Sequence, residues 1–145
     1  MKHKVEIAAS ILSADLCHLK DDLNTMVNAG IDRIHLDMMD HQFVPNLSMG
    51  PMFCKALRQA GFKLPIDVHL MVQQPDDIIA TCIESGATSI AIHQEACHDP
   101  IATLAQIKAG HCQTALAVNP DTSLDFFMQQ GHCIDILLIM TVYPG

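Results

Sequence analysis

Six short apolar runs, separated by stretches of helical character, limit the folds open to this chain more than any other feature. The runs are rich in β-branched and aliphatic residues, and they cover residues 5–10, 33–39, 65–71, 89–95, 114–120 and 135–142. Their starts lie roughly 20–35 residues apart, which is typical of repeated βα units. Strands that are apolar on both faces and alternate with helices predict a parallel sheet covered by helices.

The segments between these runs predict helices over about residues 15–28, 50–60, 75–85, 100–109 and 124–130. A glycine follows each of them, as expected at the C-terminal end of a helix: Gly30, Gly61, Gly86, Gly110 and Gly131. Two arrangements fit this α/β pattern, an open doubly wound sheet or a (β/α)8 barrel. A barrel needs eight strands and typically about 250 residues. With six strands in one domain of 145 residues, we expect either an open sheet or part of a barrel.

Polar residues recur at every second position of two neighbouring strands. His35, Asp37 and Met39 share one face of the second strand, and Asp67, His69 and Met71 repeat the pattern on the third. Ser10, Asn119 and Met140 stand at the C-terminal ends of other strands, where α/β proteins build their sites.

A shared partner is the simplest explanation for His35, Asp37 and His69 on neighbouring strands, and a divalent metal ion fits that role. A buried imidazole or carboxylate without a partner costs several kcal/mol, and two imidazoles with one carboxylate suit Zn²⁺, Fe²⁺ or Mn²⁺. The alternative stays open that the histidines are ordinary core residues and that Met39, Met71 and Met140 only fill the core. We interpret His93 and Glu95, on one face of the fourth strand, as structural or as supporting the ligands. His3, His18, His98, His111 and His132 are predicted to be solvated.

Charge and cysteine usage exclude several classes of protein. The net charge of −8 argues against binding of nucleic acid or an anionic membrane, although helix N-termini or a metal can still bind a small anion. The six cysteines form no C-x-x-C pair and suit reduced thiols in the cytoplasm. No signal peptide or membrane-spanning run is expected.

Five motifs in this order resemble the ribulose-phosphate 3-epimerase family: "ILSADL", "HLDMMDHQFVPNLSMGP", "DVHLMV", "AVNPDT" and "IMTVYPG". The resemblance covers residues 5–145, and the combination of H-x-D-x-M-D, F-V-P-N and H-L-M is specific. It implies a (β/α)8 barrel, of which about the first six strands are present here. It also implies an isomerase that binds a ketopentose phosphate and one divalent ion (Zn, Fe, Mn or Co), and a homo-oligomer.

The resemblance also assigns roles to single residues. The counterparts of His35, Asp37 and His69 bind the metal, and that of Asp37 is one of two acid/base carboxylates. The counterparts of Ser10, His69, Met39, Met71, Met140 and Gly145 contact the substrate, and Gly145 opens a loop that binds phosphate. The reaction implied is removal of the C3 proton of ribulose 5-phosphate, through an enediolate, to give xylulose 5-phosphate.

This chain departs from the family pattern in three places. His41 stands where the family usually has glycine, and Asp121 stands where it usually has a small residue. The family also continues beyond Gly145, and there it carries the second acid/base aspartate, which is the fourth metal ligand, and the last two strands. We therefore expect half of the catalytic pair in this chain. Two alternatives stay open, an epimerase of a related ketose phosphate such as allulose 6-phosphate, and a silent chain that only binds metal or partners.

Overall fold

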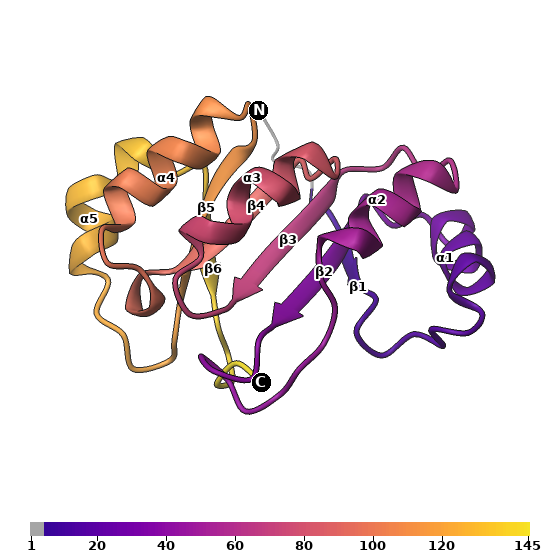
Figure 1. Cartoon of the computed structure of the whole chain (residues 1–145), viewed down its shortest axis with the longest axis horizontal. Coiled ribbons are helices and arrows are strands. Elements are labelled where there is room, and N and C mark those ends of the chain that lie inside the picture. Colours follow the sequence, from indigo (N-terminus) through magenta and orange to yellow (C-terminus); the bar gives the residue numbers. More distant parts are fainter. Residues whose placement is uncertain (1–4) are drawn as a thin grey trace.

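The computed structural model describes residues 5–145, which form one sheet of six parallel strands with helices between them (Figure 1). The strands are β1 (Ala8–Ser10), β2 (Arg33–Met39), β3 (Ile66–Met71), β4 (Ser89–His93), β5 (Gln113–Val118) and β6 (Ile136–Ile139). They lie side by side in the order in which they occur in the sequence, and each pairs in parallel with the next.

The helices decide between the two arrangements that the sequence left open. They are α1 (Leu19–Asn28), α2 (Pro51–Gln59), α3 (Asp76–Glu84), α4 (Pro100–Ala109) and α5 (Asp125–Gln130), and Figure 1 shows them on one side of a curled sheet. A doubly wound sheet has helices on both faces and reverses its strand order at a switch point. Sequential strands with helices on one side are instead the arrangement of a (β/α)8 barrel. The predicted fold class, with six strands of such a barrel, is confirmed.

The core lies between the helices and the outer face of the sheet. Ile34, Leu36 and Met38 alternate along β2 and are at most 1% exposed, in one apolar cluster with Leu23 of α1 and Leu57 of α2. These outward-facing residues leave positions 33, 35, 37 and 39 for the inner face. Packing of the outer face therefore fixes which side chains of β2 point into the barrel.

Helix α1 begins at Leu19, later than the predicted start at about residue 15. The Asp15 carboxylate accepts hydrogen bonds from the Cys17 amide and contacts the His18 ring, at 2.9 and 2.8 Å. The Asp15 amide in turn donates to the Asp22 carboxylate at 2.9 Å. These local bonds compete with helix formation, which is why aspartate favours turns and helix starts.

The ends of several strands also differ from the prediction, including those of β1, β4 and β6. β1 begins at Ala8, because the preceding Ile7 amide donates to the Asp32 carboxylate at 2.9 Å instead of joining the ladder. β4 ends at His93, and a 3-10 turn over Gln94–Ala96 follows. Glu95 is therefore not a strand residue that shares a face with His93, as the sequence suggested. β6 is shorter than predicted and ends before Met140.

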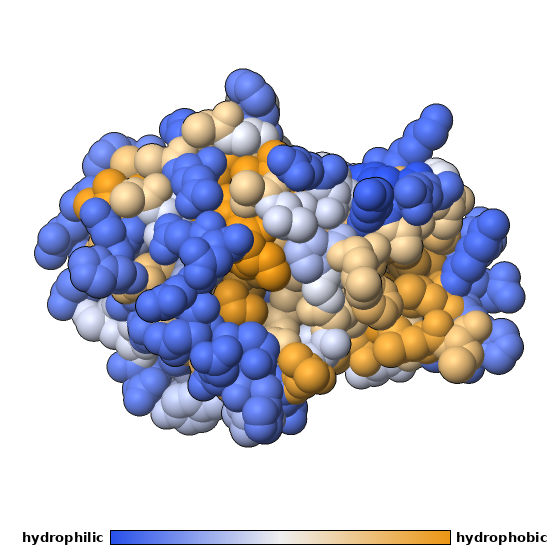
Figure 2. All heavy atoms as spheres, viewed as in Figure 1, coloured by the Kyte–Doolittle hydropathy of each residue, from blue (hydrophilic) through white to orange (hydrophobic). Residues whose placement is uncertain are grey.

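The outer face changes character from one side of the molecule to the other. Figure 2 shows hydrophilic residues mixed with apolar ones over α4 and α5, and mainly apolar residues over the lower part of α2 and the segment that joins β1 to α1. Leu16 of that segment is 54% exposed and Met52 of α2 is 72% exposed.

Within residues 5–145, every helix is too short or too polar to cross a membrane.

The cysteines are expected to differ strongly in reactivity. All six are free thiols; Cys17 is exposed, whereas Cys54, Cys82 and Cys112 are buried. Burial raises the pKa of the Cys82 thiol to about 12 and also raises the pKa of Cys54 and Cys112, which lowers the fraction of reactive thiolate. We expect iodoacetamide to alkylate Cys17 in the native protein and to spare these three, as peptide mass spectrometry would show. The matched control is the same labelling in guanidinium chloride, where all six should react; rapid native labelling of Cys82 would contradict the buried cluster.

Candidate functional site

Three neighbouring strands bring the polar side chains of the inner face together. In the pairing of β2 with β3, Asp37 lies opposite His69, and in the pairing of β1 with β2, Ser10 lies opposite His35. His35 and Asp37 are both half-buried, two residues apart on the same face. The register therefore places a hydroxyl, a carboxylate and two imidazoles at the C-terminal end of the sheet.

Asp37 is at the centre of this group. Its Oδ1 lies 3.2 Å from His35 Nε2 and 3.1 Å from His69 Nδ1. Its Oδ2 accepts a hydrogen bond from the Ser10 hydroxyl at 2.6 Å, and the Ser10 oxygen in turn accepts one from the Leu12 amide at 3.2 Å. The two carboxylate oxygens thus have different partners, and the carboxyl plane is held in one orientation.

The surroundings keep Asp37 ionised and His69 neutral. Burial alone would raise the pKa of Asp37, but hydrogen bonds from His35, His69 and Ser10 outweigh it and lower the pKa well below its usual range. Burial lowers the pKa of His69, and the nearby Asp37 carboxylate opposes this only in part. At neutral pH the pair is a carboxylate beside a neutral imidazole, the protonation state that a metal ion requires of its ligands.

The group fits a divalent metal ion. His35, Asp37 and His69 each offer one donor atom, and these atoms all lie within 4.8 Å of one another. The spacings of 3.1 and 3.2 Å to Asp37 Oδ1 match donor atoms that bind one ion at about 2.0–2.2 Å and are therefore about 3 Å apart. Two nitrogens with a carboxylate oxygen suit zinc, iron or manganese.

A cavity of about 320 Å³ borders this group. It is lined by Asp37 together with four of the predicted substrate contacts, Met39, Met71, Met140 and Gly145. Met39 and Met71 lie opposite each other on β2 and β3 and are 7% and 1% exposed. The cavity wall beside the carboxylate is therefore apolar.

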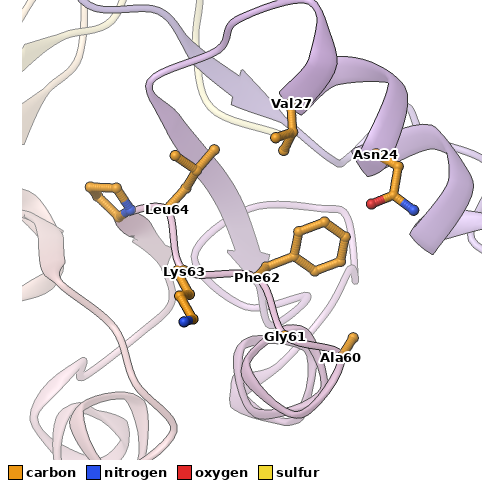
Figure 3. Close-up of a pocket in the computed structure, with 8 residues that line it drawn as sticks. Asn24, Val27, Ala60, Gly61, Phe62, Lys63 and Leu64 are labelled. Atoms are coloured by element: carbon orange, nitrogen blue, oxygen red, sulfur yellow. The ribbon is translucent and has the colours of Figure 1, made fainter.

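A larger cavity, of about 500 Å³, lies at the opposite, N-terminal end of the strands. Figure 3 shows it between α1, which contributes Asn24 and Val27, and the segment from Ala60 to Pro65 that leads into β3. Among residues 5–145, its lining has one charged side chain, Lys63, and no imidazole or carboxylate. Of these two cavities, the smaller one is therefore the one with a carboxylate, Asp37, in its described lining.

Comparison with known proteins assigns the chain to a family. The sequence model described as "Ribulose-phosphate 3 epimerase family" matches residues 6–145. The chain belongs to the ribulose-phosphate 3-epimerase family. It is 46% identical over 142 residues to ribulose-phosphate 3-epimerase of Buchnera aphidicola subsp. Schizaphis graminum, and 43% identical over 139 residues to that of Escherichia coli K12.

The chain spans about 62% of the length of these two relatives, which match 98% and 96% of it. Among solved structures, phosphoribosyl anthranilate isomerase from Thermotoga maritima superposes on 98% of the chain with a TM-score of 0.65 at 16% identity. At that identity the likeness shows a shared fold and nothing about substrate.

Two departures from the family pattern affect loops beside the site. His41 has φ of 60°, the left-handed conformation that the usual glycine adopts more easily, and its ring contacts the Pro45 carbonyl. Asp121 interacts with Tyr143 of the cavity lining and raises the pKa of that phenol. The donor atoms of His35, Asp37 and His69 are not involved in either change.

The remaining histidines divide as the sequence predicted, with one addition. His18, His98, His111 and His132 are exposed, and His3 lies outside the described residues. His93 is fully buried, and its Nε2 lies 2.8 Å from His69 Nε2. Its polar character inside an otherwise apolar run was the available signal, but its contact with a neighbouring strand was not predictable from spacing.

Sequence reasoning also missed residues that shape the cavity. Leu12, Asn46 and Val142 line it, and Asn46 belongs to the F-V-P-N motif, so that signal was present. Asp40 was missed as well: its carboxylate accepts hydrogen bonds from the amides of Gln42, Phe43 and Gln73 at 2.8–2.9 Å. It ties the loop after β2, which carries Asn46 of the cavity lining, to the loop after β3.

Proposed function

We propose that the protein epimerises D-ribulose 5-phosphate to D-xylulose 5-phosphate at C3, a step of the pentose phosphate pathway in the cytoplasm. The observation that carries this proposal is the Asp37 carboxylate, held between two imidazoles and the Ser10 hydroxyl at the edge of a cavity. Membership of the family supports the substrate class.

In the proposed reaction Asp37 is the proton acceptor. The C3 proton of the substrate lies α to the C2 carbonyl, so its removal sends the C3–H electron pair toward that carbonyl and leaves an enediolate. Asp37 Oδ1 faces the imidazoles, which leaves Oδ2 to take the proton, and Ser10 orients that oxygen. A second acid then returns a proton to the other face of C3; from the family resemblance we expect this acid beyond Gly145.

His35, Asp37 and His69 would hold the divalent ion. The chemistry supplied by such an ion is positive charge beside the substrate oxygens, which stabilises the negative charge of the enediolate. The chain's own residues keep Asp37 ionised and His69 neutral. The methionines Met39, Met71 and Met140 exclude water without offering the enediolate a competing proton donor. Gly145, in the same lining, is the proposed first residue of the phosphate site.

Proton exchange tests the proposal directly. The protein is incubated with Zn²⁺ and ribulose 5-phosphate in D₂O, and deuterium at C3 is followed by NMR. Exchange needs one working base, whereas epimerisation needs two acid/base groups. We expect deuterium at C3 that depends on metal and is lost when EDTA is added. Metal-bound protein that leaves C3 unlabelled would contradict the role of Asp37.

A substrate panel separates the alternatives. Faster exchange with allulose 6-phosphate than with ribulose 5-phosphate would identify an epimerase of a related ketose phosphate. Deuterium at C3 without xylulose 5-phosphate would show that the Asp37 side of the reaction is assembled and that the second acid is not supplied. A folded, metal-loaded protein that exchanges neither sugar would identify a chain that only binds metal or partners.

A further inference from the structure

We propose that His93 and Glu95 are positioning residues, which hold the His69 imidazole so that its Nδ1 faces the metal site. The inference rests on the metal site proposed above. Neither residue lines the cavity that borders Asp37, so both would act through His69 and not on the substrate.

The His69 ring faces the metal site with one nitrogen and β4 with the other. Its Nδ1 lies 3.1 Å from Asp37 Oδ1, and its Nε2 lies 2.8 Å from His93 Nε2. The ring is 1% exposed and stacks on the His93 ring, with centroids 5.0 Å apart and planes 29° apart. Nδ1 is therefore the nitrogen beside Asp37, and Nε2 points away from the site to β4.

Metal binding at His69 would determine which imidazole nitrogens of His69 and His93 carry protons. A histidine binds a metal through a lone pair, so binding through Nδ1 places the His69 proton on Nε2. That proton has one partner at 2.8 Å, His93 Nε2, which must then accept it. A neutral imidazole that accepts at Nε2 carries its own proton on Nδ1.

Glu95 faces the other nitrogen of the His93 ring. Its Oε2 lies 3.4 Å from His93 Nδ1. Among residues 5–145 this buried nitrogen has no hydrogen bond within the usual angular limits, so Glu95 acts on it through its charge. A carboxylate favours a proton on the facing nitrogen and disfavours a lone pair there. Glu95 is itself fixed, because its Oε1 accepts from the Asn119 amide at 3.3 Å and from the Thr122 hydroxyl.

The surroundings of His93 shield its ring from solvent, whereas the Glu95 side chain keeps 26% of its exposure. The ring is 0% exposed, and the Phe43 ring packs against it with centroids 5.0 Å apart. Burial of an imidazole costs free energy unless its nitrogens find partners, and His69 and Glu95 are the partners that the structure supplies. A hydrogen bond from the ring nitrogen that does not bind the metal fixes the tautomer and orientation of a metal-binding histidine.

Zinc affinity tests the inference without relying on catalysis. The affinity for Zn²⁺ alone is measured by competition with a chelator dye for the unaltered protein, His93→Leu, His93→Gln and Glu95→Gln. We expect His93→Leu to weaken binding by about 10- to 100-fold. His93→Gln should retain most of the affinity, because its amide oxygen can still accept from His69 Nε2, and Glu95→Gln should show a smaller loss than His93→Leu. Ile92→Val, which trims the adjacent buried residue of β4, is the control for a general loss of packing.

Nitrogen NMR of the zinc-loaded, unaltered protein provides the second measurement, which does not depend on any variant folding. We expect the proton of His69 on Nε2 and that of His93 on Nδ1. Equal zinc affinity in the unaltered protein and folded His93→Leu would overturn the inference while leaving the metal site intact, as would a His93 proton on Nε2. If the unaltered protein binds no zinc, the proposed metal site fails and this inference fails with it.

Discussion

Replacement of Asp37 by asparagine is expected to reduce deuterium exchange at C3 of ribulose 5-phosphate by roughly 10³-fold or more. A positioned general base contributes about 10²–10⁴-fold, and the same carboxylate would also bind the metal. Asparagine has nearly the same shape, and its amide oxygen can still accept the Ser10 hydrogen bond. The substitution therefore removes the charge and the proton acceptor with little change in packing, and exchange followed by NMR at saturating Zn²⁺ measures the loss.

The matched control is Asp67→Asn. Asp67 lies on the same inner face, directly opposite His35 in the register of β2 with β3, but its carboxylate is bound by the Arg33 guanidinium and the Ser89 hydroxyl. We expect this variant to exchange at close to the unaltered rate per folded molecule. Equal losses in the two variants would mean that any lost carboxylate disturbs the inner face, and the assignment of the proton acceptor to Asp37 would then be wrong.

The fold was predictable because local pattern and global packing agree. Alternation of buried and half-buried residues along β2 places His35 and Asp37 on one face, and the regular alternation of strands with helices predicts parallel crossovers. The choice between a doubly wound sheet and a barrel did not follow from pattern. It depends on which face the helices cover, and all helices of residues 5–145 lie on one side of the sheet (Figure 1).

The grouping of donor atoms followed from register, whereas the network behind it did not. Period two on adjacent strands was enough to bring Asp37 and His69 together. The contact between His69 and His93 depends on how the two imidazole rings are oriented on β3 and β4, which spacing along the sequence does not give. Glu95 was misplaced because the sequence continued β4 through a segment that forms a 3-10 turn. Strand ends are set by tertiary bonds such as those of Glu95 to Asn119 and Thr122, which spacing does not encode.

Arg33 is a further feature that spacing did not reveal, and it gives the largest expected effect on stability. Its Nε donates to both Asp67 oxygens at 2.9 Å, and its Nη2 contacts Asp67 Oδ1 at 2.7 Å and donates to Gln113 Oε1 at 3.0 Å. A weaker contact reaches the Ser89 hydroxyl at 3.4 Å. One guanidinium therefore bridges β2, β3, β4 and β5 at the end of the sheet opposite Asp37.

Arg33→Met should lower the free energy of unfolding by about 3 kcal/mol, because it leaves the Asp67 charge without its partner. This loss is at the low end of the range usual when one partner of a buried ion pair is removed. The reason is that the Arg33 and Asp67 side chains are still 16% and 17% exposed, so water partly solvates the remaining charge. Urea denaturation followed by circular dichroism measures the change. Metal affinity of the folded fraction should be unaffected, because the Arg33 guanidinium contacts Asp67, Ser89 and Gln113 and none of the proposed ligands.

The double variant Arg33→Met/Asp67→Leu distinguishes charge burial from lost packing. If the cost of Arg33→Met comes from the unpaired carboxylate, removal of that carboxylate should restore much of the lost stability, since a buried ion pair contributes little beyond an apolar pair of similar size. The single variant Asp67→Leu completes the comparison. If the double variant loses as much stability as Arg33→Met and Asp67→Leu together, the guanidinium contributes mainly through its bonds to Gln113 and Ser89. In that case the four strands are held by the arginine as a bridge, and the pairing of opposite charges is secondary.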